Sequence, residues 1–198
     1  RKTYNEAWYP GETVNLGIGQ GTILTTPLQL AVATAGIANR GKVMKPRLLA
    51  EARDPVTDKI VRQGEPELLH TVSNTEEQWD LVISAMNDVV HAPNGTARRI
   101  SEGAAYLFAG KSGTAQVFSL ARYEKYEASK LAKELHDHAL FVAFAPLERP
   151  RIALSIILEN GGGGSANAAP IARILFDDYL NRLEPVQGPV SNETADLL

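Results

Sequence analysis

The sequence predicts an α+β fold in which an antiparallel sheet is flanked by helices. Two short apolar runs, 139–145 and 151–158, are separated by the five-residue loop Pro146–Pro150, a pattern typical of two buried strands in a hairpin. A further strand pattern over 107–118 precedes them, and segments with helical spacing stand before and after this set. Helices and strands grouped in this way are typical of the α+β class.

Composition is that of an ordinary globular protein and excludes several kinds of function. The chain has 198 residues, of which 44% are hydrophobic and 22% charged, with a net charge of −3. This mildly acidic balance gives no reason to expect nucleic acid as a partner. The absence of cysteine excludes disulfides and thiolate metal sites. We expect no metal and no cofactor.

The first quarter of the chain predicts a loop, a helix and a strand. Residues 1–25 are rich in Gly, Pro and Asn and are expected to form a leading loop. Thr26 and Pro27 supply an N-cap and a first-turn proline for a helix that ends before Gly41. Its predicted core face consists of Leu28, Ala31, Val32 and Ala35. A strand interrupted at Pro46 is expected over 43–49.

A surface hairpin and a second helix follow. The hairpin is expected over 54–64, with Pro55 and Asp58 as turn residues. Ser73 or Asn74 is expected to cap the helix, and Pro93–Gly95 ends it. Helical spacing predicts a core face made of Trp79, Val82, Ile83, Met86 and Val89.

The last third contains a charged insert and a closing helix. Residues 120–135 are dense in charge and are expected to form a solvated helical insert. After the glycine run 161–164, a helix is predicted from about 168 to 183. Its expected apolar stripe is Ala172, Phe176, Tyr179, Leu180 and Leu183. We expect residues 1–183 to be part of one domain and 184–198 to be a disordered tail.

The most informative motif is Lys111-Ser112-Gly113-Thr114, which lies on the predicted strand 107–118. The period of two puts Ser112 and Thr114 on one face of that strand and Lys111 and Gly113 on the other. Because a long insert joins this strand to the next, it can lie at the sheet edge and offer free backbone groups to an extended peptide. Such a strand suits the binding of a peptide carboxylate beside a serine nucleophile.

Several blocks of sequence share one order with a known family. They are Gly19-Gln-Gly21 with Thr26–Leu30, Gly110–Gln116, Phe141–Pro146, Glu159-Asn160 before the glycine run, and Ala169-Pro170. The series resembles class B penicillin-binding proteins, most of all the elongation type, penicillin-binding protein 2, over about residues 10–183. The resemblance implies a penicillin-binding protein/serine β-lactamase-like fold that is incomplete in this chain.

The resemblance also implies an activity, that of a D,D-transpeptidase which cross-links peptidoglycan stem peptides by serine acyl transfer and is acylated by β-lactams. The family uses Ser-x-x-Lys, Ser-x-Asn and Lys-Thr/Ser-Gly. Only the third motif is recognised here, and no Ser-x-x-Lys occurs in the 198 residues. We therefore expect the start of the chain to be a cut inside a longer protein, the nucleophile to lie outside it, and the chain alone to be inactive.

By the same resemblance, the catalytic residues within the chain are Lys111, Ser112 and Thr114. Lys111 would supply positive charge and help hold the proton-transfer network around the serine. Ser112 and Thr114 would bind the terminal carboxylate of the substrate, and the Thr114 N–H would be one donor of the oxyanion hole. Gly113 would let the substrate backbone approach, so that the substrate-binding set is Lys111, Ser112, Gly113 and Thr114.

The partners that the resemblance implies are stem peptides ending in D-Ala–D-Ala, β-lactam antibiotics, membrane proteins of the elongation machinery with their glycan polymerase, and the N-terminal part of the same protein. It places the protein at the periplasmic face of the bacterial inner membrane, anchored by an N-terminal transmembrane helix that this chain lacks. A non-catalytic penicillin-binding or sensor module of the same fold is the alternative. A serine β-lactamase is a weaker one, because the Gly-Gln-Gly block and the long insert fit transpeptidases better.

Three shorter patterns compete with this interpretation. Ser165-Ala-Asn167 matches Ser-x-Asn, but its place between a glycine run and a helix favours a loop and helix cap. Gly110-Lys111-Ser112 matches the end of a phosphate-binding loop, which would need glycine where Ala105 stands and a helix starting at the lysine. His136 and His138 could hold a metal, but no third ligand is evident.

Overall fold

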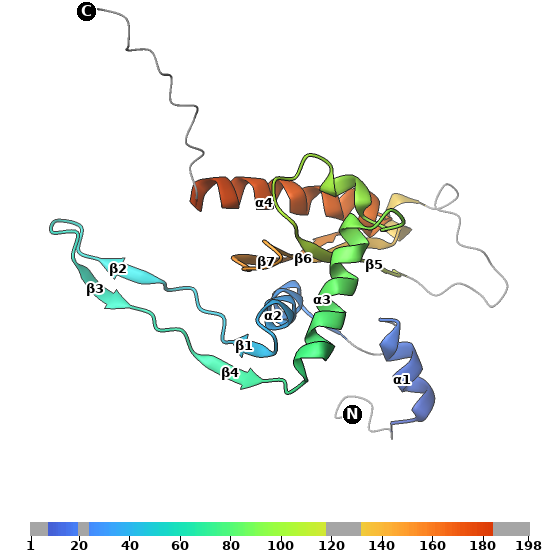
Figure 1. Cartoon of the computed structure of the whole chain (residues 1–198), viewed down its shortest axis with the longest axis horizontal. Coiled ribbons are helices and arrows are strands. Elements are labelled where there is room, and N and C mark those ends of the chain that lie inside the picture. Colours follow the sequence, from blue (N-terminus) through green and yellow to red (C-terminus); the bar gives the residue numbers. More distant parts are fainter. Residues whose placement is uncertain (1–7, 20–23, 118–131, 184–198) are drawn as a thin grey trace, which may run out of the picture.

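A three-stranded antiparallel sheet forms the centre of the molecule. The computed structural model describes residues 8–19, 24–117 and 132–183. The strands are β5 (Ala109–Ala115), β6 (His138–Ala145) and β7 (Ile152–Leu158), in the order β5-β6-β7 (Figure 1). The predicted hairpin and the predicted edge position of the strand that carries Lys111 are both confirmed.

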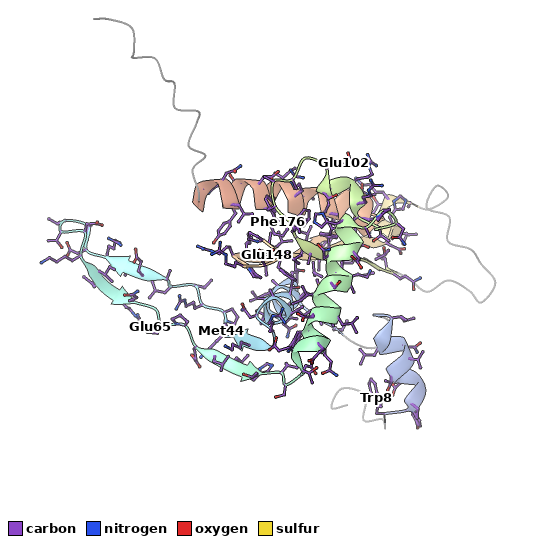
Figure 2. The ribbon with its side chains drawn as sticks, viewed as in Figure 1. Trp8, Met44, Glu65, Glu102, Glu148 and Phe176 are labelled. Carbon is purple, nitrogen blue, oxygen red and sulfur yellow. The ribbon has the colours of Figure 1, made fainter. Side chains whose placement is uncertain are left out.

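Helices cover both faces of this sheet. α4 (Ala169–Leu183) lies on one face and α2 (Pro27–Ala38) on the other, while α3 (Glu76–His91) runs past β5 (Figure 1). Phe176 of α4 lies between that helix and the sheet (Figure 2). The side chains of Phe108, Phe141 and Phe176 are fully buried and belong to one apolar cluster. Burial of these rings holds α4 and the sheet together.

α2 begins as the sequence predicts but buries a different face. The Thr26 hydroxyl accepts a hydrogen bond from the Gln29 N–H at 3.2 Å, and the Gln29 side chain accepts one from the Thr26 N–H at 2.8 Å. The predicted core face was wrong at Leu28, which is 59% exposed, whereas the buried positions are Thr34 and Gly36. Small residues on α2 are buried because they allow the helix backbone to approach its neighbours closely.

Part of the expected leading loop is helical, which corrects the prediction. α1 spans Pro10–Gly17, with proline in its first turn. The Glu12 carboxylate accepts a hydrogen bond from the Tyr9 N–H at 2.7 Å and so satisfies a donor at the helix start. This local capping outweighs the glycine-rich composition. No residue of α1 itself is buried.

A long two-stranded ribbon leaves the body after α2. β1 (Lys42–Met44) pairs with β4 (Leu68–Thr71), and β2 (Glu51–Arg53) pairs with β3 (Ile60–Gln63). The ribbon reaches away from the sheet, and Glu65 lies between β3 and β4, about midway along it (Figures 1 and 2).

The sequence located the ribbon's turn better than its strands. The hairpin prediction is confirmed at its turn, where Asp54 accepts hydrogen bonds from the Val56 and Thr57 N–H groups and Asp58 has a φ of 54°. The expected strand over 43–49 ends at Met44, and β4 was not predicted.

α3 forms as predicted, but its N-cap and one of its core positions differ from the prediction. Thr75 caps the helix, not Ser73 or Asn74, since its hydroxyl accepts from the Gln78 N–H at 3.3 Å. Trp79 and Met86 are buried as predicted. Val82 is 41% exposed, and Val90 is buried instead.

The segments around α4 complete the fold. A 3₁₀ turn, η1 (Arg98–Ser101), lies between α3 and β5, and a π-helical turn, η4 (Gly164–Ala168), leads directly into α4. Ala172 and Phe176 are buried as predicted, whereas Tyr179 is 38% exposed. The charged insert expected over 120–135 lies mostly outside the described residues, as does the tail 184–198. A short 3₁₀ helix, η3 (Lys133–Leu135), stands just before β6.

Candidate functional site

The polar motif lies on the edge strand β5 and is open to solvent. Lys111 and Thr114 are exposed, and Ser112 and Gly113 are half-buried. The Lys111 ammonium donates a hydrogen bond to the Ser112 carbonyl oxygen at 2.6 Å. β6 pairs with one side of β5, and the other side has no strand partner within the described residues. The structure thus combines an exposed cation, two hydroxyls and a free strand edge.

Thr96, which lies 16 residues before Ser112 in the chain, contacts this strand. Its hydroxyl oxygen lies 3.4 Å from that of Ser112. The chain turns here because helix α3 has ended, and the Ala97 N–H donates back to the Val89 carbonyl at 2.9 Å. Sequence reasoning missed Thr96 and treated this turn only as a helix stop. The available signal was a hydroxyl residue directly after Asn94-Gly95, at the end of a helix that leads toward the motif.

The last residue of α3, His91, holds Phe108, the residue just before β5. The Phe108 N–H donates to His91 Nε2 at 3.2 Å, and the two rings meet edge to face with centroids 5.3 Å apart. Burial lowers the pKa of His91 below its ordinary value of 6.5. Only the unprotonated nitrogen can accept this bond, so a neutral His91 anchors the strand. The Phe176 ring also meets Phe108 edge to face, with ring centroids 5.5 Å apart.

Two glycines meet directly behind the motif. A side chain at Gly164 of η4 would overlap the carbonyl oxygens of Gly113 and Leu140. η4 therefore lies backbone against backbone on β5 and β6. This contact sets the position of the strand at its most polar point.

An open groove of about 660 Å³ lies between η1, η4 and the start of α4. Thr96 is part of its wall. Its lining combines charged and apolar residues: Thr96, Ala97, Arg99, Ile100, Glu102, Ser165, Ala166, Pro170, Arg173, Ile174 and Asp177. Glu102 lies over the first half of α4 in Figure 2. One residue of the groove wall, Thr96, thus also contacts Ser112 of β5.

Arg173 shapes this groove by holding η1 to α4. Its guanidinium pairs with Asp177 at 2.9 Å and donates to the carbonyl oxygens of Ile100, Glu102 and Gly103 at 2.8–3.0 Å. The Tyr106 hydroxyl donates to Asp177 at 2.7 Å. Burial first, and then the bond to that carboxylate, raise the pKa of Tyr106 well above its ordinary value.

The local structure around the three competing motifs can be compared with what each motif requires. Ser165-Ala-Asn167 falls in η4, between the glycine run and α4 as predicted, and the Asn167 amide donates to the Gly161 carbonyl at 2.6 Å. Lys111 lies within a strand, so the loop-to-helix geometry of a phosphate-binding loop is not formed. His138 Nδ1 accepts a hydrogen bond from the Asn160 N–H at 2.9 Å. No cluster of three or more metal-ligating side chains occurs in the part of the chain that is described.

Comparisons with known proteins agree on one family. The model of the penicillin binding protein transpeptidase domain matches residues 2–177. Peptidoglycan D,D-transpeptidase MrdA of Haemophilus influenzae is 46% identical over 187 residues, which are 93% of this chain. The structure of Pseudomonas aeruginosa PBP2 in complex with WCK 5153 matches 91% of the chain with 41% identity and a TM-score of 0.72. Helicobacter pylori PBP2, in its complex with MreC, matches 93% with 27% identity and a TM-score of 0.70.

The match covers much less of the relatives than of this chain. The chain spans 28% of the Haemophilus protein and 36% and 30% of the two solved chains. Among the described residues, no helix is both long and apolar enough to cross a membrane. The resemblance to penicillin-binding protein 2 that the sequence predicts is confirmed, and so is the fold. The chain belongs to the penicillin-binding protein transpeptidase family.

Proposed function

We propose that this chain is the C-terminal portion of a peptidoglycan D,D-transpeptidase and that β5 binds the acyl donor. The observation that carries the proposal is the exposed Lys-Ser-Gly-Thr edge strand in a member of this family. The donor stem peptide would extend β5 as a further strand. Its terminal carboxylate would accept hydrogen bonds from Ser112 and Thr114, with the Lys111 ammonium nearby.

The chemistry is acyl transfer through a serine ester. The serine oxygen attacks the carbonyl carbon of the D-Ala–D-Ala bond, the C–N bond breaks, and D-Ala leaves with a proton on its nitrogen. The Thr114 N–H would stabilise the oxyanion that forms, a contribution worth about 10²- to 10³-fold in rate for one donor. Since no Ser-x-x-Lys occurs in the 198 residues, we assign the nucleophile to a part of the protein outside them.

We also propose partners and a location for the whole protein. Similarity to the Helicobacter PBP2 that binds MreC supports an MreC-like partner from the elongation machinery. We further propose that the whole protein is anchored in the inner membrane with this region in the periplasm, and that β-lactams acylate it as analogues of the donor.

Covalent labelling with a fluorescent penicillin tests the proposal. The full-length protein is expected to carry one label that boiling in detergent does not remove, whereas these 198 residues alone remain unlabelled because the nucleophile is missing. Labelling of the isolated chain would refute our placement of the serine.

The same full-length protein distinguishes an enzyme from a sensor module. A transpeptidase, once acylated by a donor peptide, releases it to an added amine. A sensor that retains the fold binds penicillin but forms no new peptide bond, and such a result would favour the alternative.

A further inference from the structure

We propose that His91 is a positioning residue for acyl transfer, because it holds the backbone of Phe108 and so fixes the edge of β5 that meets the donor. This inference rests on the proposed function, since it assigns a further residue to the same reaction. The observation that carries it is a hydrogen bond between the free edge of the strand and the last residue of α3.

The Phe108 N–H belongs to the same edge of the strand as the groups proposed to bind the donor. The Leu107 carbonyl accepts a hydrogen bond from the Leu147 N–H at 2.8 Å, on the side where β6 lies. Backbone groups of successive residues in a strand point to opposite sides, so those of Phe108 point away from β6. The same alternation puts the backbone groups of Ser112 and Thr114 on the free edge.

His91 therefore holds the start of this edge. Its Nε2 accepts the Phe108 N–H at 3.2 Å, the one hydrogen bond of the His91 side chain within the described residues. The Phe108 ring is fully buried and meets the rings of His91 and Phe176 edge to face, with centroids 5.3 and 5.5 Å away. Since both its ring and its N–H are held, Phe108 leaves β5 little freedom to slide or twist.

Two other contacts hold β5 from different directions. β6 pairs with it from Ala109 to Ala115 along one edge, and Gly164 of η4 lies against the backbone of Gly113. His91 acts from the opposite edge, on which the Thr114 N–H lies. A catalytic hydrogen-bond donor must stay within about 0.5 Å of its productive position. Loss of the His91 contact should therefore slow acylation even where the fold survives.

Only the neutral form of His91 can hold the strand. The unprotonated nitrogen accepts the Phe108 N–H, and protonation turns that nitrogen into a donor. Burial lowers the pKa of His91 below its ordinary value of 6.5, which keeps the ring neutral in neutral solution. The contribution to acylation is thus complete above the ordinary pKa and is lost as the pH falls through the lower pKa of the folded state.

The charged groups around this junction are engaged elsewhere or exposed. The ionisable side chains on the surrounding elements are Asp88 on α3, Arg98, Arg99 and Glu102 in and after η1, Lys111 on β5, Tyr106 before β5, and Arg173 and Asp177 on α4. The last three are hydrogen-bonded with one another, and the others are exposed. In the ranges that the structure describes, none of them is hydrogen-bonded to His91.

Stopped-flow acylation of the full-length protein by a fluorescent penicillin tests the assignment with two substitutions. His91→Gln keeps an uncharged acceptor of similar reach, whereas His91→Phe keeps an aromatic ring but removes the acceptor. In neutral buffer, His91→Phe should acylate about 2- to 10-fold more slowly than wild type, the factor that corresponds to a hydrogen bond between neutral groups. His91→Gln should stay closer to the wild-type rate.

The pH profile distinguishes positioning from a contribution to stability alone. Between pH 8 and pH 5, the ratio of the wild-type rate constant to that of His91→Gln should fall by about 2- to 10-fold, because only wild type loses its acceptor. A purely structural role would lower the fraction of protein that is labelled at completion and leave the rate constant of the folded fraction as it is. His70→Gln is the matched control, since His70 is exposed on β4 of the ribbon, and it should follow the wild-type profile.

The outcomes separate the two proposals. If the wild-type protein is not acylated, the proposed function fails. If it is acylated and both His91 variants match its rate constant at every pH, only the assignment of His91 fails. If His91→Phe does not fold, the ratio of wild type to His91→Gln decides alone, and a ratio that does not change with pH overturns the assignment.

Discussion

At the residue scale, Lys111 is the side chain whose role is most directly testable. It is exposed on β5 and hydrogen-bonded only to the carbonyl of its own neighbour among the described residues, so its charge is available to a substrate or a nucleophile. In the full-length protein, Lys111→Ala should slow penicillin acylation by about 10²- to 10⁴-fold, the range for a group that acts in proton transfer. Stopped-flow acylation measures this, and a wild-type rate would remove Lys111 from the mechanism.

Gly164 is the second residue with a specific consequence. Because any side chain there would overlap the carbonyl oxygens of Gly113 and Leu140, Gly164→Ala should push β5 out of place. We expect a loss of about 1–3 kcal/mol in the free energy of unfolding, the usual cost of overpacking, together with slower penicillin acylation.

Gly163→Ala is the matched control for that substitution. A side chain at Gly163 would meet only the Ala166 Cβ at 3.9 Å, an ordinary contact. Urea unfolding of both variants measures the difference. Equal stabilities would contradict the backbone contact.

At the scale of elements, the junction of α3 with β5 should depend on pH. Burial lowers the pKa of His91 in the folded state, so the unfolded chain binds more protons near pH 6. This contribution to stability is complete above the ordinary pKa of 6.5 and is lost as the pH falls below it. Thermal unfolding between pH 8 and pH 5 should show a steeper decline for wild type than for His91→Gln. Parallel curves would contradict this view of the junction.

The contacts of Arg173 between α4 and η1 should contribute more to the free energy of unfolding than a single ion pair would. The Arg173 side chain is only 18% exposed, and removing it takes a donor from three carbonyl oxygens and leaves the Asp177 carboxylate with the Tyr106 hydroxyl but without its cation. Arg173→Ala should destabilise the protein by about 2 kcal/mol or more.

Arg182→Ala provides the comparison, because it removes an exposed i,i+4 pair with Asp178 on the same helix. Such a pair contributes about 0.5 kcal/mol. Guanidinium unfolding measures the loss in the free energy of unfolding for each variant. Losses of similar size would show that the carbonyl contacts of Arg173 contribute little to stability.

At the scale of the whole molecule, a large apolar surface is open. A pocket of about 570 Å³ is lined by Leu28, Val32, Val43, Pro46, Leu69, Val72 and Trp79, among others. We expect the 198 residues alone to bind the apolar dye ANS, and full-length protein to bind less for each molecule. We infer that further segments of the protein cover this surface. Equal ANS fluorescence from the 198 residues and from the full-length protein would contradict this inference, and so would a monomeric 198-residue chain that binds no ANS.

The sequence predicted those parts of the fold that depend on local patterns. The hairpin of β6 and β7, the Thr26 cap and the edge position of β5 follow from short apolar runs, a capping pair and a long connection. The buried face of α2 did not follow, because Leu28 and Gly36 differ in which neighbours they meet across the fold and not in helical spacing. The exposure of Val82 has the same origin.

For the site, the polar strand could be predicted from the sequence but its surroundings could not. Thr96 and Ser112 meet only in three dimensions, and the groove is built by η1, η4 and α4 from widely separated segments. No spacing rule connects such residues in a single sequence. The roles of Lys111, Ser112, Gly113 and Thr114 remain predictions that the experiments above decide.

The ribbon formed by β1 to β4 has a practical consequence. β2 and β3 pair with each other away from the sheet, and the turn at Asp54–Asp58 closes the far end (Figure 1). Val56 in this turn is 90% exposed, and the 198 residues contain no cysteine. A cysteine introduced at Val56 would therefore be the single site for a thiol-reactive fluorophore in this chain, and it would lie far from β5. The tip of the ribbon is thus a suitable labelling site for following this protein by fluorescence microscopy or for attaching it to a surface.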